Sequence, residues 1–152
     1  MFVVRRLARL GLPVGADEMR AAERADAGSA FHQRRAREHA DAYEAEVGRA
    51  LARLGATFKT ETDLRAAGIR LTPDFLLDTP LAIGGKEIAW IDAKNYAYYG
   101  NRLTLPGLRR QARKYTDAFG PGAMVFAGGV ACDAPPLGAL ALGPGWPALA
   151  RA

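Results

Sequence analysis

Three charged side chains in the middle of the chain have the types and spacing of a site that cleaves phosphodiesters. Asp74 follows Thr72-Pro73 at the start of one predicted strand, and Asp92 and Lys94 lie two residues apart near the end of the next. Alternate residues of a strand point to the same face of the sheet, so the side chains of Asp92 and Lys94 should lie on one face. A hairpin folded about residue 83, the mean of 74 and 92, would set the two aspartates opposite each other.

Two facing carboxylates beside one ammonium suit a divalent cation. Mg²⁺ prefers oxygen ligands and takes one or two protein carboxylates, with water and substrate phosphate completing its shell. It would neutralise charge that develops on a phosphate and lower the pKa of a bound water. Lys94 would orient that water or stabilise the negative transition state. We therefore expect Mg²⁺ here, with Mn²⁺ as an alternative, because Asp74 and Asp92 would otherwise repel each other.

Each residue taken singly also has an ordinary structural explanation. An Asp after Thr-Pro is common at a turn or a strand start. An Asp and a Lys two apart on a strand usually form an exposed ion pair worth less than about 1 kcal/mol. The three residues together, at this spacing and on this order of predicted elements, favour a catalytic role.

Hydrophobic spacing predicts the elements that would position this site. A helix is predicted over 31–54, ending at Gly55, with a buried stripe made of Tyr43, Val47, Ala50, Leu51 and Leu54. An earlier helix over 16–27 should be interrupted at Gly28-Ser29. Strands are predicted over 56–60, 72–77, 87–95 and 123–130.

Turn residues separate these strands. A polar turn is expected over 61–68, and Gly84-Gly85 is typical of a hairpin turn. Pro106 should open a second helix that Gly120 ends. The order helix, three strands, helix, strand predicts an α/β (α+β) fold, in which helices flank a mixed central sheet.

Composition narrows the class of protein. The 152 residues are 49% hydrophobic and 24% charged, which leaves room for one compact domain. A single cysteine excludes a disulfide framework and a Cys-rich zinc site, and two histidines make a histidine-ligated metal site improbable. The net charge of +5 suits a polyanionic partner, although such an excess is also an ordinary solubility device. No apolar run approaches the roughly 20 residues that span a membrane, so we expect a soluble intracellular protein.

The charged trio resembles the motif of the PD-(D/E)xK nucleases, whose restriction-endonuclease-like core has the same order of elements. Further segments resemble the codanin-interacting nuclease family, known also by its Thr-Pro-Asp signature. The resemblance covers about residues 43–130 and rests on Tyr43-Glu44, Thr60-Glu61, Leu64-Arg65, residues 72–76, residues 80–88, residues 90–94 and residues 119–122.

This resemblance implies roles for individual residues. Asp74 and Asp92 would be the metal carboxylates, joined by the Ala93 carbonyl, and Lys94 the catalytic lysine. Glu44 matches an auxiliary acid beside the metal. Glu46 is its rival, but its spacing to Arg49 suggests an ion pair on the exposed face of the helix.

The helix after Lys94 offers further candidates. Gln111 and Tyr115 reproduce a Gln-x-x-x-Tyr pattern found in exonuclease-like branches of the superfamily, although a core Tyr and a solvated Gln explain it equally well. A basic cluster could grip phosphates or simply form a soluble face; it consists of Arg102, Arg109, Arg110, Arg113 and Lys114. Three tyrosines past Lys94 could stack on an unpaired base or pack their loop, namely Tyr96, Tyr98 and Tyr99.

These features divide the chain into three segments: a basic helical arm over 1–36, a nuclease-like domain over 37–131 and a Pro/Gly-rich tail over 132–152. The tail should lack a fixed fold, unless its leucines and Trp146 dock on the domain or on a partner. The Arg-rich first 16 residues read as an organelle transit peptide, an amphipathic lead-in helix or the start of a truncated larger protein.

Three functions follow from this interpretation. The first is a Mg²⁺-dependent nuclease acting on DNA or RNA. The second is a nuclease-like module that binds a codanin-type protein partner without turnover. The third is a nucleic-acid binder that does not hydrolyse. The resemblance implies the nucleus or the cytoplasm, while the Arg-rich start leaves an organelle open.

Overall fold

The computed structural model describes the backbone of residues 16–151 and the side chains of residues 33–150. The chain forms two compact units that divide at residue 40, and the site lies in the second. Helix α2 (Ala16–Arg53) is continuous, so the predicted interruption at Gly28-Ser29 is wrong. A glycine inside a helix costs only about 1 kcal/mol, which a long helix tolerates. The alternatives for the first 16 residues concern positions outside the described part, apart from Ala16.

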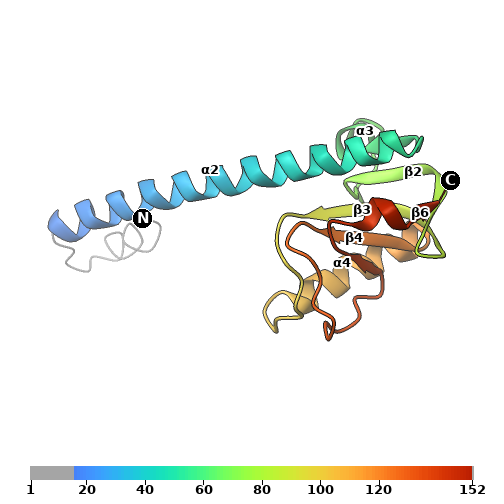
Figure 1. The fold of residues 1–152 in the computed structure, drawn as a ribbon. Coiled ribbons are helices and arrows are strands. Elements are labelled where there is room, and N and C mark those ends of the chain that lie inside the picture. Colours follow the sequence, from blue (N-terminus) through green and yellow to red (C-terminus); the bar gives the residue numbers. More distant parts are fainter. Residues whose placement is uncertain (1–15, 152) are drawn as a thin grey trace. The chain divides into compact units, whose positions relative to one another are not determined.

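A mixed sheet between helices forms the second unit, as predicted (Figure 1). Strands β1 (Phe58–Thr60), β2 (Phe75–Ile83) and β3 (Lys86–Lys94) are antiparallel neighbours. Helix α4 (Leu105–Phe119) then leads to β4 (Gly122–Phe126), which pairs parallel to β3. Strand β5 (Leu140–Leu142) adds parallel to β4, and β6 (Ala150–Arg151) pairs with β2.

Two hydrophobic clusters cover the two faces of this sheet. Val47, Ala50 and Leu51 of α2 pack on one face. Leu108, Ala112 and Tyr115 of α4 pack on the other, around Trp90 of β3. The indole Nε1 of Trp90 donates to the Gly120 carbonyl at 2.9 Å. A Cβ on Gly122 would lie 2.1 Å from the indole ring, so this position admits only glycine.

The β2–β3 hairpin changes register along its length. Gly84 and Gly85 both have positive φ and form the predicted turn. Leu81 pairs with Ile88 near the turn, whereas Leu76 pairs with Trp90 further on. The four residues 77–80 on β2 therefore face one residue, Ala89, on β3. This bulge moves the midpoint of the pairing from the turn to residue 83, the register that sets position 74 opposite position 92.

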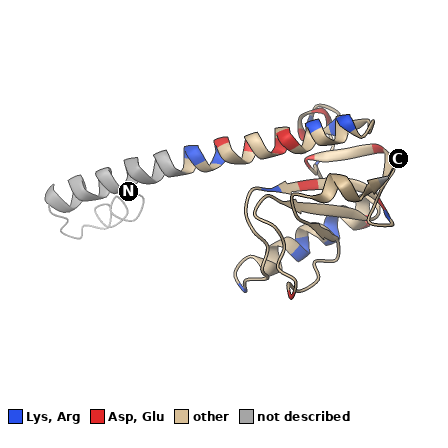
Figure 2. Ribbon diagram, viewed as in Figure 1, with Lys and Arg blue, Asp and Glu red and all other residues tan. Residues whose placement is uncertain are grey.

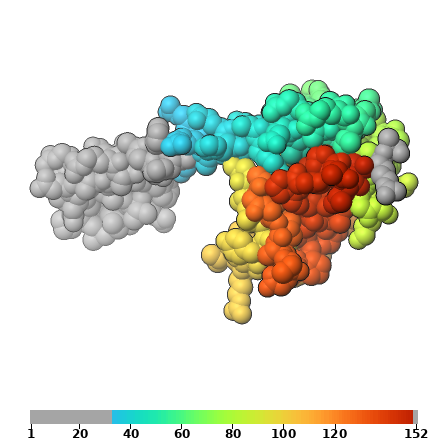
Figure 3. All heavy atoms as spheres, in the orientation of Figure 1, coloured from blue at the N-terminus to red at the C-terminus, as the bar shows by residue number. Residues whose placement is uncertain are grey.

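The C-terminal segment is part of the fold, so the expectation that it lacks a fixed structure is wrong. It supplies β5, the 3₁₀ helix η1 (Trp146–Leu149) and β6. The Trp146 side chain is 3% exposed and joins the α2-side core with Leu51. In Figure 3 the red C-terminal atoms lie beside the green end of α2. The alternative in which Trp146 docks on the domain is thus confirmed.

No helix in the described part of the chain is both long and apolar enough to cross a membrane.

We predict that Trp146→Ala lowers the free energy of unfolding by about 3–5 kcal/mol, because it empties a buried indole site. Leu149→Ala, in the same 3₁₀ helix but 52% exposed, should change it by less than about 0.5 kcal/mol. Urea unfolding of both variants measures the difference. Equal effects at the two positions would contradict the packing of the tail on the domain.

Candidate active site

Asp74 and Asp92 meet at the open end of the β2–β3 hairpin. The register that pairs Phe75 with Ile91 sets them at the next position along. The backbone N–H of Ala93 donates to Oδ2 of Asp74 at 2.6 Å, which ties that carboxylate to β3. Asp92 is 2% exposed, the one buried acid or base among the described side chains. The two carboxylates are therefore neighbours in a largely dry setting.

Both oxygens of Asp92 have positively polarised neighbours. Gln111 Nε2, from α4, donates to Oδ1 at 3.0 Å. The Lys94 ammonium forms an ion pair with Oδ2, and the Lys94 side chain is only 18% exposed. Asp92 and Lys94 share the α4 face of β3, as their spacing predicts. The structure thus brings Asp74, Asp92, Lys94 and Gln111 together.

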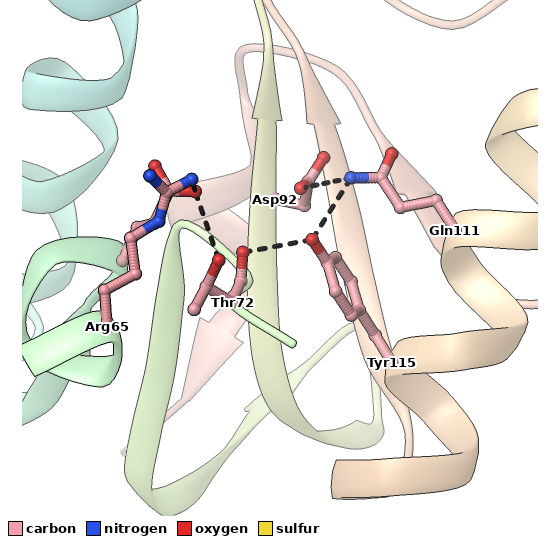
Figure 4. A network of polar contacts seen from close by, with 6 residues as sticks. Arg65, Thr72, Asp92, Gln111 and Tyr115 are labelled. Atoms are coloured by element: carbon pink, nitrogen blue, oxygen red, sulfur yellow. Dashed lines mark hydrogen bonds and ion pairs between the residues drawn. The ribbon is translucent and has the colours of Figure 1, made fainter. Parts of the chain in front are cut away.

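A polar network fixes the segment that leads into Asp74 (Figure 4). The Tyr115 hydroxyl donates to the Thr72 carbonyl at 3.0 Å and accepts from Gln111 Nε2 at 3.3 Å. The Thr72 hydroxyl donates to Oε1 of Glu61 at 3.1 Å, which also accepts from Arg65 at 2.5 Å. The strand start is therefore held from two helices, and Asp74 enters the site in a defined position.

Glu61 and its helix are the part of the site that the sequence analysis missed. The predicted polar turn over 61–68 is wrong, because α3 (Glu61–Ala66) is a short helix. Its signal is a capping box: the Asp63 N–H donates to the Thr60 hydroxyl, and the Asp63 carboxylate accepts from the Thr60 N–H. The Thr-x-x-Asp spacing of a capping box was present in the sequence.

Burial raises the pKa of both aspartates, and the charge of Asp92 adds to the shift at Asp74. Desolvation, followed by the charge of Asp92, raises the pKa of Asp74 to about 7, although the Ala93 N–H opposes the shift. Desolvation also raises the pKa of Asp92, against the opposing effect of Lys94. The pair therefore holds a proton more readily than two free carboxylates would.

Lys94 is held as an ammonium ion. Burial lowers the pKa of its side chain, but the contact with Asp92 outweighs burial and the net pKa is above its usual value. A lysine in this state donates hydrogen bonds and positive charge. It does not accept a proton at neutral pH.

Glu44 lies on α2 within electrostatic reach of this pair. Desolvation raises its pKa, and the charges of Glu61, Asp41 and Asp92 add to the effect. It lines a cavity of about 370 Å³, together with Gly48 and Phe75. The Phe75 ring occupies the space beside Gly48, where a Cβ would lie 3.2 Å from it. Glu46 is exposed on the same helix.

The residues expected to bind nucleic acid fall into two groups. Arg110, Arg113 and Lys114 are exposed, and Figure 2 shows basic positions in blue along α4. Arg109 is also exposed, but its Nε donates to the Pro136 carbonyl at 2.9 Å. Tyr115 is 8% exposed and packs edge-on against Trp90, so its ring is a core side chain, not a nucleic-acid contact.

Carboxylates are the side chains here that are able to hold a metal. No group of three or more Asp, Glu, His or Cys side chains with metal-binding geometry occurs within the described residues. Asp74 and Asp92 nevertheless supply the two carboxylates that Mg²⁺ commonly takes from protein. Ala93 lies between Asp92 and Lys94, with its N–H already bonded to Asp74.

Comparisons place the chain among known sequences. A family model described as protein of unknown function TPD sequence-motif matches residues 15–134. Protein L539 of Acanthamoeba polyphaga mimivirus is 51% identical over 81 residues, half of this chain. CDAN1-interacting nuclease 1 is 37% identical over 91 residues in Mus musculus, 58% of this chain, and 38% identical over 71 residues in Homo sapiens, 46% of it.

The matched segments are only a part of each relative's own length. The matched segments cover 30% of L539, 32% of the mouse protein and 25% of the human protein. No solved structure matches significantly.

The raised pKa of Asp74 predicts a loss of stability as the pH rises. The unfolded chain releases this proton near pH 4, whereas the folded chain keeps it to about pH 7. Folding therefore takes up a proton between these values, and stability falls by up to about 1.4 kcal/mol per pH unit. Asp74→Asn should remove this component, so its stability relative to the parent should grow from pH 4 to pH 7 in urea unfolding with EDTA.

Asp78→Asn, on the exposed part of β2, is the matched control and should run parallel to the parent across the same pH range. A parallel course for Asp74→Asn would show that Asp74 has an ordinary carboxyl pKa.

Proposed function

Since the chain belongs to the TPD sequence-motif family and is similar to CDAN1-interacting nuclease 1, we propose that it is a metal-dependent nuclease. It would hydrolyse phosphodiester bonds of DNA or RNA with Mg²⁺, or Mn²⁺ in its place. The chain spans about a third or less of the length of these relatives, so the activity in their name is carried over as part of this proposal.

One observation carries the proposal: two carboxylates face each other in a largely buried setting, with one ammonium beside them. Burial raises the pKa of both aspartates, the charge of Asp92 raises that of Asp74 further, and Lys94 balances only one negative charge. Proteins rarely bury such a pair without a cation or a proton to relieve it. A site of this kind is suited to a divalent ion and to a substrate that brings its own negative charge.

The donor set fits magnesium. Asp74 and Asp92 would hold the ion with the Ala93 carbonyl, and Glu44 would assist from α2. Two protein carboxylates suffice for Mg²⁺ because water and phosphate oxygens complete its shell. The bound ion would supply charge neutralisation at the phosphate and a more acidic water.

The groups around the two carboxylates each have a role in the proposed reaction. Lys94 is an ammonium ion, so it would stabilise negative charge developing on the phosphate and orient the attacking water. Gln111 holds Oδ1 of Asp92, and the Ala93 N–H holds Oδ2 of Asp74. These two bonds fix the carboxylates before substrate arrives, so little reorganisation is needed.

The exposed cations of α4 would grip the strand. Arg110, Arg113 and Lys114 flank Gln111 on the same helix, and phosphate contacts of this type position a nucleic acid without reading its sequence. Arg109 is bonded to the Pro136 carbonyl and would contribute less.

The names of the relatives favour a second candidate. CDAN1-interacting nuclease 1 is named for a protein partner. A nuclease-like module that binds a codanin-type protein without turnover would keep the same fold, and the carboxylate pair would then serve no reaction.

We predict that Asp74→Ala, Asp92→Ala and Lys94→Ala each lower the rate of Mg²⁺-dependent cleavage by about 100-fold or more, because each removes a group that acts on the transition state. The measurement uses labelled single-stranded and duplex DNA and RNA, with Mg²⁺ or Mn²⁺ and with EDTA. Asp78→Ala and Lys59→Ala, exposed on β2 and β1, should cleave like the parent.

Two outcomes would count against the nuclease. Cleavage by Asp74→Ala and Lys94→Ala at the parental rate would refute the site. No cleavage with any metal, together with capture of codanin by both the parent and Asp74→Ala, would establish the binding module instead.

The exposed cations of α4 give a separate prediction about how the affinity for nucleic acid depends on salt. Replacing Arg110, Arg113 and Lys114 together by Ala should flatten the slope of log affinity against log salt by about 2 to 3, since each lost phosphate contact contributes about 0.7–0.9. The matched control replaces Arg49, Arg53 and Lys59, exposed on α2 and β1, and removes the same charge. An equal change in both triple variants would mean that only net charge matters.

A further inference from the structure

The loop that follows Lys94 carries aromatic side chains that the fold does not bury. Tyr96 is 41% exposed and Tyr99 is 64% exposed, while Tyr98 between them is 3% exposed. Tyrosine is enriched at binding interfaces, because its ring is apolar and its hydroxyl is polar. The loop therefore presents two rings within five residues of the candidate catalytic lysine.

The path of this loop is fixed by its neighbours. Tyr98 stacks on Phe126 with ring centroids 5.0 Å apart, and its hydroxyl donates to the Pro135 carbonyl. The Tyr98 N–H donates to the Gly129 carbonyl, and its own carbonyl accepts from Ala131. Gly100 has a φ of 71°, and a Cβ there would lie 2.2 Å from Pro135. The buried Tyr98 therefore packs the loop, which holds its neighbours in place.

The rings border a small cavity. Its volume is about 250 Å³, and its lining is Tyr96, Ala97, Tyr98, Tyr99, Asn101 and Thr104. Pockets for drug-sized ligands measure about 300–1,000 Å³, so this one suits a single planar group. The Tyr96 ring packs against Phe126, and its hydroxyl lies within electrostatic reach of both Lys94 and Asp92. The cavity is thus adjacent to the proposed site of cleavage.

We propose that this cavity binds one unpaired nucleobase of the strand whose phosphate is attacked, with the Tyr99 ring as its stacking surface. The inference rests on the proposed function and adds a substrate class: single-stranded nucleic acid, or an unpaired end beside a duplex. Bases within a duplex are already stacked, so only an unpaired base offers its face to a tyrosine. Stacking of this kind tolerates any base.

A nucleobase fits this place better than a protein side chain. The cavity begins two residues after Lys94, and α4, which carries Arg110 and Lys114, begins at Leu105, the residue after Thr104. Helix α4 contacts Asp92 through Gln111, which Arg110 and Lys114 flank, so a strand with its phosphate at Lys94 would have both the rings and these cations nearby. An apolar protein partner has no negative charge to pair with those cations.

The test is a cycle of two changes, one in the protein and one in the ligand. Affinity is measured by fluorescence anisotropy in EDTA, which prevents cleavage. The ligands are two labelled single-stranded DNA oligonucleotides, one complete and one with consecutive abasic positions at its centre. The proteins are the parent, Tyr99→Ala, Tyr99→Phe and Leu149→Ala, the last exposed next to the β2–β3 turn, at the other end of the hairpin.

The parent and Leu149→Ala should bind the complete strand about tenfold more tightly than the abasic one. Tyr99→Ala should lose most of this preference and keep its affinity for the abasic strand, whereas Tyr99→Phe, which keeps the ring, should retain the preference. Thermal unfolding checks that Tyr99→Ala is folded.

Other results overturn the inference. An unchanged preference in Tyr99→Ala, or no preference in the parent, means that the cavity does not bind a base, even if the protein cleaves DNA or RNA. Binding of codanin that is lost in Tyr99→Ala, with unchanged oligonucleotide affinity, would assign the rings to a protein partner. A base preference that depends on Tyr99 in a protein that never cleaves would support the cavity and refute the proposed nuclease.

Discussion

The repulsion between Asp74 and Asp92 is the constraint on which the rest of the site depends. Two carboxylates in a poorly hydrated setting cost free energy unless a proton, an ammonium or a metal ion lies beside them. Lys94 pairs with Asp92, while burial and then the charge of Asp92 raise the pKa of Asp74 to about 7. A divalent cation between them, as proposed, would balance the charge that Lys94 leaves.

The architecture maintains this arrangement from several directions. The bulge at 77–80 sets the register in which position 74 faces position 92. Helix α4 reaches the site through Gln111 and Tyr115, and α3 reaches it through Glu61. The C-terminal half of α2 packs against β2 and brings Glu44 close enough to raise the pKa of Asp74. If the carboxylates moved apart to relieve their repulsion, the bond from the Ala93 N–H to Asp74 or the bond from Gln111 to Asp92 would break.

Much of the fold could be predicted from sequence because its signals are local. The Gly84-Gly85 turn, the stripe through Val47 and Leu51 and the spacing of Asp92 and Lys94 depend on neighbours along the chain. The errors have physical causes. The polar residues of the α3 capping box are also typical of a turn, and Gly28-Ser29 is an interruption signal that a long helix tolerates. The docking of Trp146 depends on distant partners, which no local pattern contains, whereas the burial of Tyr115 agrees with the core tyrosine that its sequence pattern left open.

The account is tested most directly by titrating Mn²⁺ into the protein at about pH 6.5 by calorimetry in two buffers of different ionisation enthalpy. It predicts one ion per chain, bound with release of a proton as the Asp74–Asp92 pair gives up the proton that it holds without metal. Asp92→Asn should bind no ion in this range. Binding without proton release, equal binding by Asp92→Asn, or no binding by the parent would contradict the claim that these carboxylates form a cation site.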